Sequence, residues 1–279
     1  MTAVARTLVR YSVALDAQLD MLREVSEPNY QKSRALSGAD AEFVRLNLKT
    51  ATPVYVADWI CRMLHGADGS LDENLTLAPI DLPALSGFVY LTELWPIGQD
   101  GKMATRKFSW FASGQQVTFF VYIQLADGGD GPCVARGMTW HYGEAINATE
   151  HLNGDAEHAQ PFFDSRRMIY ALLSFMQQRL VSIRRERPDR AARKRAARDP
   201  RYAVAPVIQV IELRAREARH TSDAEGGRHL ETRHVRRGHW RNQWYPSEDR
   251  HKALWIHPTV VGPDGAPLID ATKLIAVAH

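Results

Sequence analysis

Cysteine is scarce in this 279-residue chain, which contains Cys61 and Cys133 and no others. The two are far apart, and neither belongs to a CxxC or Cys/His pattern with metal-ligand spacing. This argues against a disulfide-stapled secreted domain and against a structural zinc site, and it favours a reducing compartment. We expect no metal site and no cofactor.

Long apolar runs are also missing. No stretch approaches the roughly 18 apolar residues that a membrane-spanning helix needs. Residues 1–10 carry Arg6 and Arg10 among scattered apolar residues, unlike a secretory signal. We therefore expect a soluble, cytoplasmic protein with no membrane partner.

Familiar catalytic signatures are absent from the sequence as well. It contains no glycine-rich phosphate loop, no GxSxG elbow and no HExxH zinc motif. The sequence therefore predicts a class of function and not a reaction, and whether the protein is an enzyme stays open.

What the chain does have is an uneven distribution of positive charge. The net charge is +3, and apolar residues make up 45% of the chain, as in an ordinary globular protein. Residues 184–198 hold eight Lys or Arg against two acidic residues, and residues 228–252 form a second basic zone. Charge concentrated in this way is typical of proteins that contact phosphates.

Hydrophobic periodicity predicts helices in the N-terminal region. Apolar residues recur every three or four positions from Val4 to Leu22, which predicts an amphipathic helix ending before Pro28. Two further helices are expected from Gly38 or Asp40 to Leu48 and from Val56 to Leu64. The apolar face of the first helix also suits pairing with a second copy, so a homodimer is one expected arrangement.

From Gly87 the period changes to that of strands. Four aromatic and β-branched segments separated by turn-forming residues predict an antiparallel meander. They are residues 88–91, 107–111, 117–125 and 133–142.

Beyond the meander the pattern predicts one long helix from Pro161 to Arg187, followed by a mobile or helical segment to Pro200. A strand is expected from Val204 to Leu213, at a sheet edge because Pro206 cannot donate a ladder hydrogen bond. Short strands are expected near Val235, at 254–256 and at 274–277.

This order of elements predicts an α+β fold with N-terminal helices, a central antiparallel sheet, a long helix and C-terminal strands. The expected domains are a helical region at 1–80, the sheet with the long helix at 81–200, and a basic, aromatic, β-rich region at 201–279. The three can also form one domain.

The most informative segment is residues 234–247, His-Val-Arg-Arg-Gly-His-Trp-Arg-Asn-Gln-Trp-Tyr-Pro-Ser. Arginine forks bind phosphate, indoles and phenols stack on bases, and an amide reads adenine. The leading hypothesis is therefore a protein that binds DNA or RNA. Its predicted contacts are Arg236, Arg237, Arg241, Trp240, Trp244, Tyr245 and Gln243, together with Arg193, Lys194 and Arg195 of the first basic run.

Two alternatives stay open for this segment. His239 and His251 with Arg241 supply the acid, base and cation of a metal-independent, toxin-like ribonuclease. Alternatively, the aromatic residues form the core of a small sheet, and the segment serves folding or protein interaction.

The segment also carries a resemblance. Together with Trp255-Ile256-His257-Pro258, Gly262-Pro263 and the earlier Asp81-Leu82-Pro83, it resembles an uncharacterised family of proteins from actinobacterial genomes, plasmids and phages. The resemblance implies a phage or mobile-element setting, and it implies no particular activity.

Overall fold

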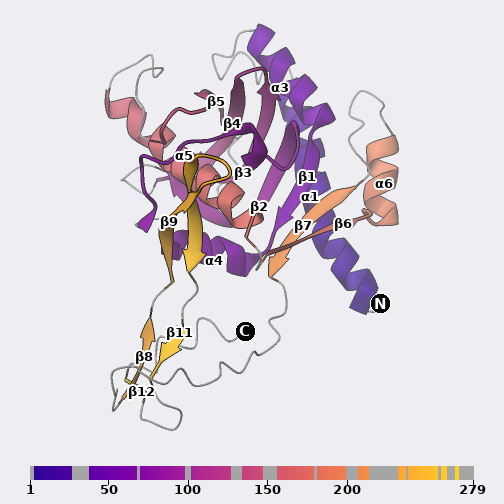
Figure 1. Cartoon of the computed structure of the whole chain (residues 1–279). Coiled ribbons are helices and arrows are strands. Elements are labelled where there is room, and N and C mark those ends of the chain that lie inside the picture. The colour runs from indigo at the N-terminus through magenta and orange to yellow at the C-terminus, as the bar shows by residue number, and fades with distance from the viewer. Residues whose placement is uncertain are drawn as a thin grey trace.

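The computed structural model describes residues 3–26, 38–67, 70–97, 102–126, 134–146, 156–178, 181–198, 207–213, 232–236, 238–256, 259–262 and 268–269. It has the predicted α+β fold, in which helices cover a mixed sheet (Figure 1). In the described residues the main sheet has seven strands in the order β5-β4-β3-β2-β1-β7-β6.

The N-terminal helices are α1 (Ala3–Ser26) and α3 (Gly38–Thr50), as predicted. The apolar face of α1 is buried within the chain, at Tyr11, Leu15, Leu19 and Leu22. Because α3 and the sheet already cover this face, the homodimer predicted from it is not supported by the packing.

A strand that the sequence analysis missed follows α3. Strand β1 (Thr52–Val56) pairs in parallel with β2 and with β7, and α4 begins only at Asp58 and runs to Ala67. The helix predicted from Val56 therefore starts two residues later, and Val56 is the last residue of a buried strand. The sheet is consequently mixed and not purely antiparallel.

The predicted meander is confirmed. Its strands are β2 (Ser86–Ile97), β3 (Met103–Ser113), β4 (Gln116–Leu125) and β5 (Val134–His141), and each pairs antiparallel with the next. Gly114, with φ of 58°, forms the tight β3–β4 turn, where a glycine avoids the steric cost of positive φ.

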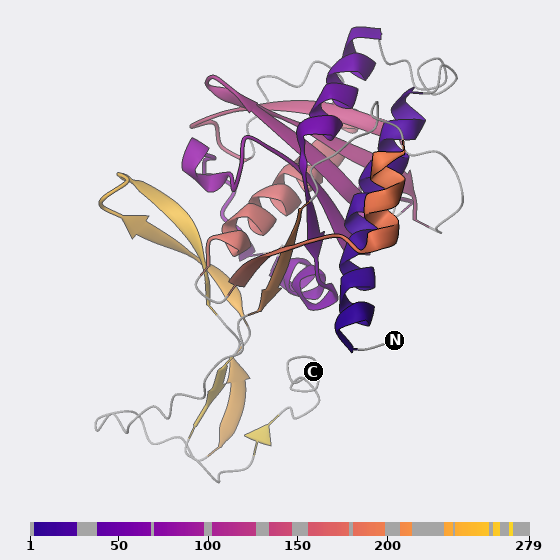
Figure 2. The same cartoon turned by 90° about the vertical axis from the view of Figure 1, so that its right-hand side faces the viewer.

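The two faces of the main sheet bury different residues of the same strands. In β2, Val89 joins the core cluster that includes α4 and α5, whereas Phe88 joins the cluster of α1 and α3. Side chains alternate between the faces of a strand, so helices on both sides require continuous apolar runs. Figure 2 shows α1, α3 and α6 on one side and α5 on the other.

The long helix is shorter than predicted. Helix α5 spans Ala156–Met176, and Val181–Glu186 is strand β6, antiparallel to β7 (Ile208–Leu213). The apolar spacing of Leu180 and Ile183 continues the helical pattern, but the sheet offers Val181 and Ile183 a ladder of hydrogen bonds. Helix α6 (Arg190–Ala197) follows.

The position of β7 also differs from the prediction. It lies inside the sheet between β1 and β6, and β6 is the edge strand. The strand begins at Ile208, and Pro206, on which the edge assignment rested, lies outside the described residues.

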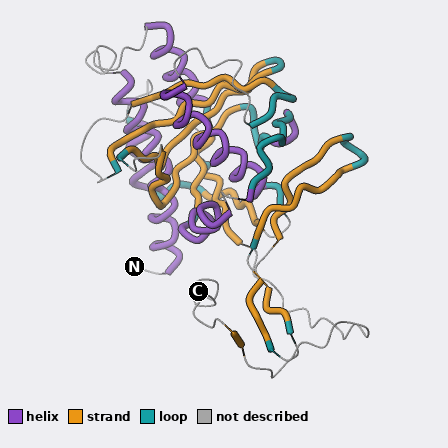
Figure 3. Tube along the Cα trace, turned by 90° about the vertical axis from the view of Figure 1, so that its left-hand side faces the viewer, coloured by secondary structure: helices purple, strands orange, loops and turns teal. Residues whose placement is uncertain are grey.

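Two small sheets complete the C-terminal region. Strands β9 (His239–Tyr245) and β10 (Arg250–Ile256) form a hairpin, and β8 (Arg233–Arg236) lies between β11 (Thr259–Val261) and β12 (Leu268–Ile269). Figure 3 shows the hairpin projecting beyond the main sheet. The strand predicted at 274–277 lies outside the described residues.

The domain division stays a prediction. One hydrophobic cluster includes Ile60, Phe108 and Trp240, one residue from each of the three expected ranges. Among the described residues, no helix is long and apolar enough to cross a membrane.

Gly87 should be intolerant of any side chain. It pairs with Trp110 across β2 and β3, and an added Cβ would overlap the Trp110 indole ring. We expect Gly87→Ala to lower the free energy of unfolding by about 1–3 kcal/mol, the usual cost of overpacking a core. Urea denaturation measures this loss.

Leu85→Ala is the matched control for this change, because Leu85 lies two residues earlier and is 76% exposed. We expect it to change the stability by less than about 0.5 kcal/mol. Equal losses for the two variants would show that the indole does not press on Gly87.

Candidate functional site

The β9–β10 hairpin contains most of the residues singled out in the sequence. The register pairs Trp240 with Trp255 near its base and Trp244 with His251 near its turn. Asp249 in the turn has φ of 50°, a conformation that aspartate tolerates better than most residues. The paired tryptophans at the base of the hairpin are buried, whereas Trp244 and His251 near its turn are exposed.

The base of the hairpin is held by aromatic packing. Trp240 and Trp255 are each 6% exposed, and their ring centroids lie 5.3 Å apart in an edge-on arrangement. Phe175 of α5 lies 4.6 Å from Trp240 and 5.4 Å from Trp255. Trp240 is therefore a core residue, and this packing leaves it no face for the base stacking predicted from the sequence.

An ion pair fixes the hairpin nearer its turn. The Arg250 guanidinium donates to both oxygens of the Asp81 carboxylate, at 2.8 and 2.7 Å. Asp81 is 5% exposed and also accepts from the Ala78 backbone N–H at 2.8 Å and from Gln177 at 3.1 Å. A bidentate pair with both oxygens satisfied is the strong form of this interaction.

The protonation of this pair follows from its surroundings. Burial by itself raises the pKa of Asp81, but the hydrogen bonds from Arg250, Ala78 and Gln177 and the Arg250 charge outweigh it and hold the pKa below its usual value. The hydrogen bonds that Arg250 donates to Asp81 and Glu248, with the charges of these two carboxylates, outweigh the effect of burial and raise the pKa of Arg250. Both groups are therefore charged at neutral pH.

Glu248 and Lys252 extend the ion pair into a network. Glu248 lies 3.0 Å from Arg250 and 3.1 Å from Lys252, and Lys252 lies 3.9 Å from Asp81. The Lys252 ammonium also sits 5.3 Å from the centre of the Tyr245 ring. Two acidic and two basic side chains balance each other here, so Lys252 is not a free cation for an external anion.

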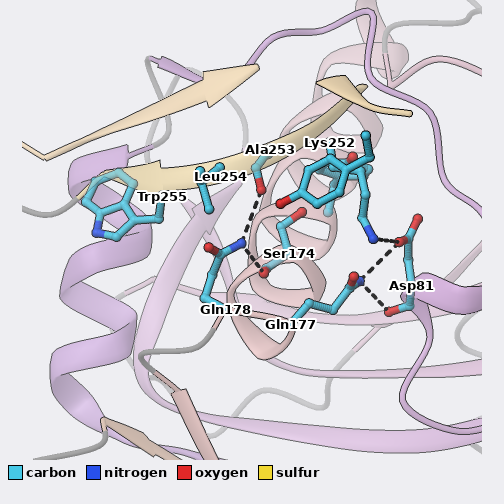
Figure 4. A pocket seen from close by; sticks show the side chains of 10 residues that line it. Asp81, Ser174, Gln177, Gln178, Lys252, Ala253, Leu254 and Trp255 are labelled. Atoms are coloured by element: carbon cyan, nitrogen blue, oxygen red, sulfur yellow. Dashed lines mark hydrogen bonds and ion pairs between the residues drawn. The ribbon is translucent and has the colours of Figure 1, made fainter. Parts of the chain in front are cut away.

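A cavity of about 460 Å³ lies between α5 and β10, beside this network (Figure 4). The Gln178 amide bridges the two elements by donating to the carbonyls of Ser174 and Ala253, at 3.1 and 3.2 Å. Burial is the main cause that raises the pKa of Tyr170, so its phenol stays neutral and hydrogen-bonding. The lining is Asp81, Tyr170, Ser174, Gln177, Gln178, Tyr245, Lys252, Ala253, Leu254 and Trp255.

The turn end of the hairpin exposes an aromatic pair. The Trp244 side chain is 42% exposed, and its ring lies 4.9 Å from that of the exposed His251. Arg241 is exposed and donates to Gln243 at 2.8 Å, while Gln243 donates to the Trp244 carbonyl at 3.0 Å. The Gln243 amide, predicted to read a base, is thus occupied locally.

The two histidines of the nuclease hypothesis do not meet. His239 pairs with Ile256, five residues along β10 from His251. At about 3.3 Å per residue this separates the two positions by roughly 16 Å. Strand alternation also puts them on opposite faces of the hairpin. They cannot act as acid and base on one phosphate beside Arg241.

Among the described residues, the predicted phosphate-binding cations have two different environments. Arg236, Arg193 and Lys194 are exposed, whereas Arg237 lies outside the described residues. Arg195 is engaged, since its guanidinium holds both oxygens of Asp16 at 2.6–3.0 Å. The described residues contain no cluster of three or more His, Cys, Asp or Glu suited to a metal ion.

Comparison with known families gives the affiliation of the chain. Residues 74–263 match the sequence model of the AcrVA2-like family, described as "Anti-CRISPR type V subtype A2 family". The chain belongs to this family. The affiliation agrees with the phage or mobile-element setting that the resemblance implied. No curated protein and no solved structure matches the chain.

The region shared with the AcrVA2-like family contains both residues of the ion pair that fixes the hairpin. It begins shortly before Asp81 and ends after the hairpin, so the Asp81–Arg250 pair and the cavity all lie within it. In the sequence Asp81 stands out only as part of the Asp81-Leu82-Pro83 segment, and no pattern there marks Arg250, Gln177 or Glu248. Asp81 and Arg250 are 169 positions apart in the sequence, and no local pattern links residues at such a separation.

Removing Arg250 should loosen the hairpin. Arg250→Ala would leave the buried Asp81 carboxylate without its main partner, and we expect a loss of about 3–5 kcal/mol in unfolding free energy at pH 7. Arg241→Ala removes an exposed arginine of the same hairpin and should change stability by less than about 0.5 kcal/mol. Equal values would refute the anchoring role.

The loss of stability in Arg250→Ala should depend on pH, and the direction of this dependence follows from the pKa of Asp81. Because the folded pKa of Asp81 is lowered, its stabilising contribution is complete above the unfolded value near 3.9 and falls away below it. In Arg250→Ala, protonation instead relieves a buried unpaired charge. The stability gap between the two proteins, measured by urea denaturation, should therefore narrow as the pH falls from 7 toward about 4.

The two ends of the hairpin should respond differently to loss of an indole. Trp240→Ala should cost about 3–5 kcal/mol, since it empties a buried site against Phe175. Trp244→Ala should cost less than about 0.5 kcal/mol, because Trp244 is 42% exposed and lies outside the buried core. Thermal unfolding of the two variants checks this contrast, and a large loss in Trp244→Ala would contradict it.

Proposed function

We propose that the protein inhibits a type V CRISPR system by binding one of its protein components through the turn end of the β9–β10 hairpin. The family description supports the inhibitory role. The observation that carries the binding surface is Trp244, a 42% exposed indole beside the exposed His251. Tryptophan is strongly enriched among residues that dominate binding energy at interfaces.

The anchoring of the hairpin supports this role. Its base is packed on Phe175, and Arg250, next to the turn, is fixed to the buried Asp81. A presented side chain on a fixed strand loses little conformational freedom when a partner binds. Binding of a partner should therefore cost little conformational entropy at this surface.

A second candidate is contact with nucleic acid, such as the RNA of an effector complex. The exposure of Arg236 and Arg241 favours it, because unburied guanidinium groups bind phosphate well. Alternation along β9, however, directs Arg241 and Trp244 to opposite faces. One strand of nucleic acid would have to wrap around the hairpin to reach both, so the protein partner is preferred.

The test is plasmid interference in bacteria that carry an active type V CRISPR system. We expect the wild-type protein to restore transformation by a targeted plasmid, and Trp244→Ala to reduce this rescue at least about tenfold, as loss of an interface hot spot implies. Leu46→Ala on α3 is the matched control, since Leu46 is 50% exposed and lies outside the family match.

The outcomes separate the two candidates. No rescue by the wild-type protein would refute the inhibitory function. Suppose that Trp244→Ala still rescues transformation and the double variant, Arg236→Ala with Arg241→Ala, does not. This result would favour contact with nucleic acid over binding of a protein component. Protein levels of each variant in the cells, measured by immunoblotting, control for stability.

A further inference from the structure

Helix α6 and strand β6 carry the most basic segment of the chain at one edge of the main sheet. Residues 184–198 hold eight Lys or Arg, and the structure divides them into two groups. Arg184 lies 3.6 Å from Glu186 and donates to the Tyr11 hydroxyl at 3.2 Å, and Arg195 is bound to Asp16. These two arginines hold the segment in place.

One face of α6 is fixed on α1. Ala192 is fully buried against Tyr11 and its neighbours, and Asp189 caps the helix by accepting the Ala192 N–H at 2.8 Å. The Asp189 backbone N–H in turn donates to Ser12 at 3.0 Å. The orientation of the helix is therefore set by contacts that involve Arg195 but no other cation of α6.

The remaining six cations are exposed, and none forms an ion pair with a residue that the structure describes. Arg190, Arg193 and Lys194 are spaced three and four positions apart and so share the helix face opposite to Ala192. We call the whole set the basic edge; it consists of Arg185, Arg187, Arg190, Arg193, Lys194 and Arg198.

Folding explains only part of the basic edge, because Lys194 and Arg198 stand at the C-terminal end of α6, where the helix dipole favours a cation. Arg190 stands at the first position of α6, where the helix dipole is positive and a cation is unfavourable. Like charges three and four residues apart on a helix also repel one another. The dipole effect at Arg190 and the repulsion between the cations both destabilise the folded state. A bound anion would relieve both, so an anionic ligand suits this surface.

We propose that the basic edge binds the phosphate backbone of a nucleic acid, at a site separate from the hairpin. Five of its six cations are arginines, whose planar forks match phosphate oxygens. From Arg190 to Arg198 the helix rises about 12 Å, the axial length of three to four nucleotide steps. Contacts to the phosphate backbone carry no base-sequence information, so we expect binding that does not depend on base sequence.

The test is binding of labelled duplex DNA and single-stranded RNA to the full chain over a series of salt concentrations. In the variant with Arg190→Gln, Arg193→Gln and Lys194→Gln we expect at least tenfold weaker binding and, for the duplex, a salt slope reduced by roughly 2 to 3. The charge-matched control carries Arg23→Gln, Lys49→Gln and Arg62→Gln, on helices α1, α3 and α4.

Each result decides the inference. Weaker binding in the α6 variant but not in the control variant supports the inference. The probe whose binding falls more, DNA or RNA, identifies the class of nucleic acid. Equal loss in both variants, or no binding by the wild-type protein at low salt, overturns it. If polyglutamate binding falls in the first variant while nucleic-acid binding does not, the surface binds acidic protein and the inference is wrong. Trp244→Ala should leave this assay unchanged, which keeps it independent of the hairpin function.

Discussion

The buried ion pair between Asp81 and Arg250 is the contact on which the C-terminal part of this structure depends. It joins the short 3-10 helix Pro79–Asp81, between α4 and β2, to a hairpin 169 residues later, with donor–acceptor distances of 2.7 and 2.8 Å. Ala78 and Gln177 donate further hydrogen bonds to the Asp81 carboxylate. A buried charge is costly unless it is paired, and these contacts make the pair a stable link of fixed geometry between the two segments. Asp81 also lines the cavity beside α5, together with residues of α5 and β10.

The hairpin combines two kinds of surface in one short element. At its base Trp240 and Trp255 complete the core around Phe175, while at its turn Trp244 meets solvent beside His251. The chemically similar indoles thus have opposite roles, decided by how far each lies from α5. A fixed base makes the exposed turn a defined surface, which suits a protein that acts by binding.

The basic edge and the hairpin belong to different parts of the fold. The former is held on α1 through Ala192 and Arg195, and the latter on α5 and Asp81. Both lie within the region shared with the AcrVA2-like family. The two surfaces proposed for binding are therefore anchored separately.

The sequence by itself determined the elements whose signals are local. The spacing of Tyr11, Leu15, Leu19 and Leu22 marks α1, and the aromatic segments and turns mark the meander, because helix and strand periodicities act over a few residues. Only the tertiary structure decided that Val181–Glu186 is a strand and that Trp240 is core while Trp244 is exposed. It alone paired Asp81 with Arg250 and separated His239 from His251. Each of these depends on partners distant in the chain, and local patterns carry no information about such contacts.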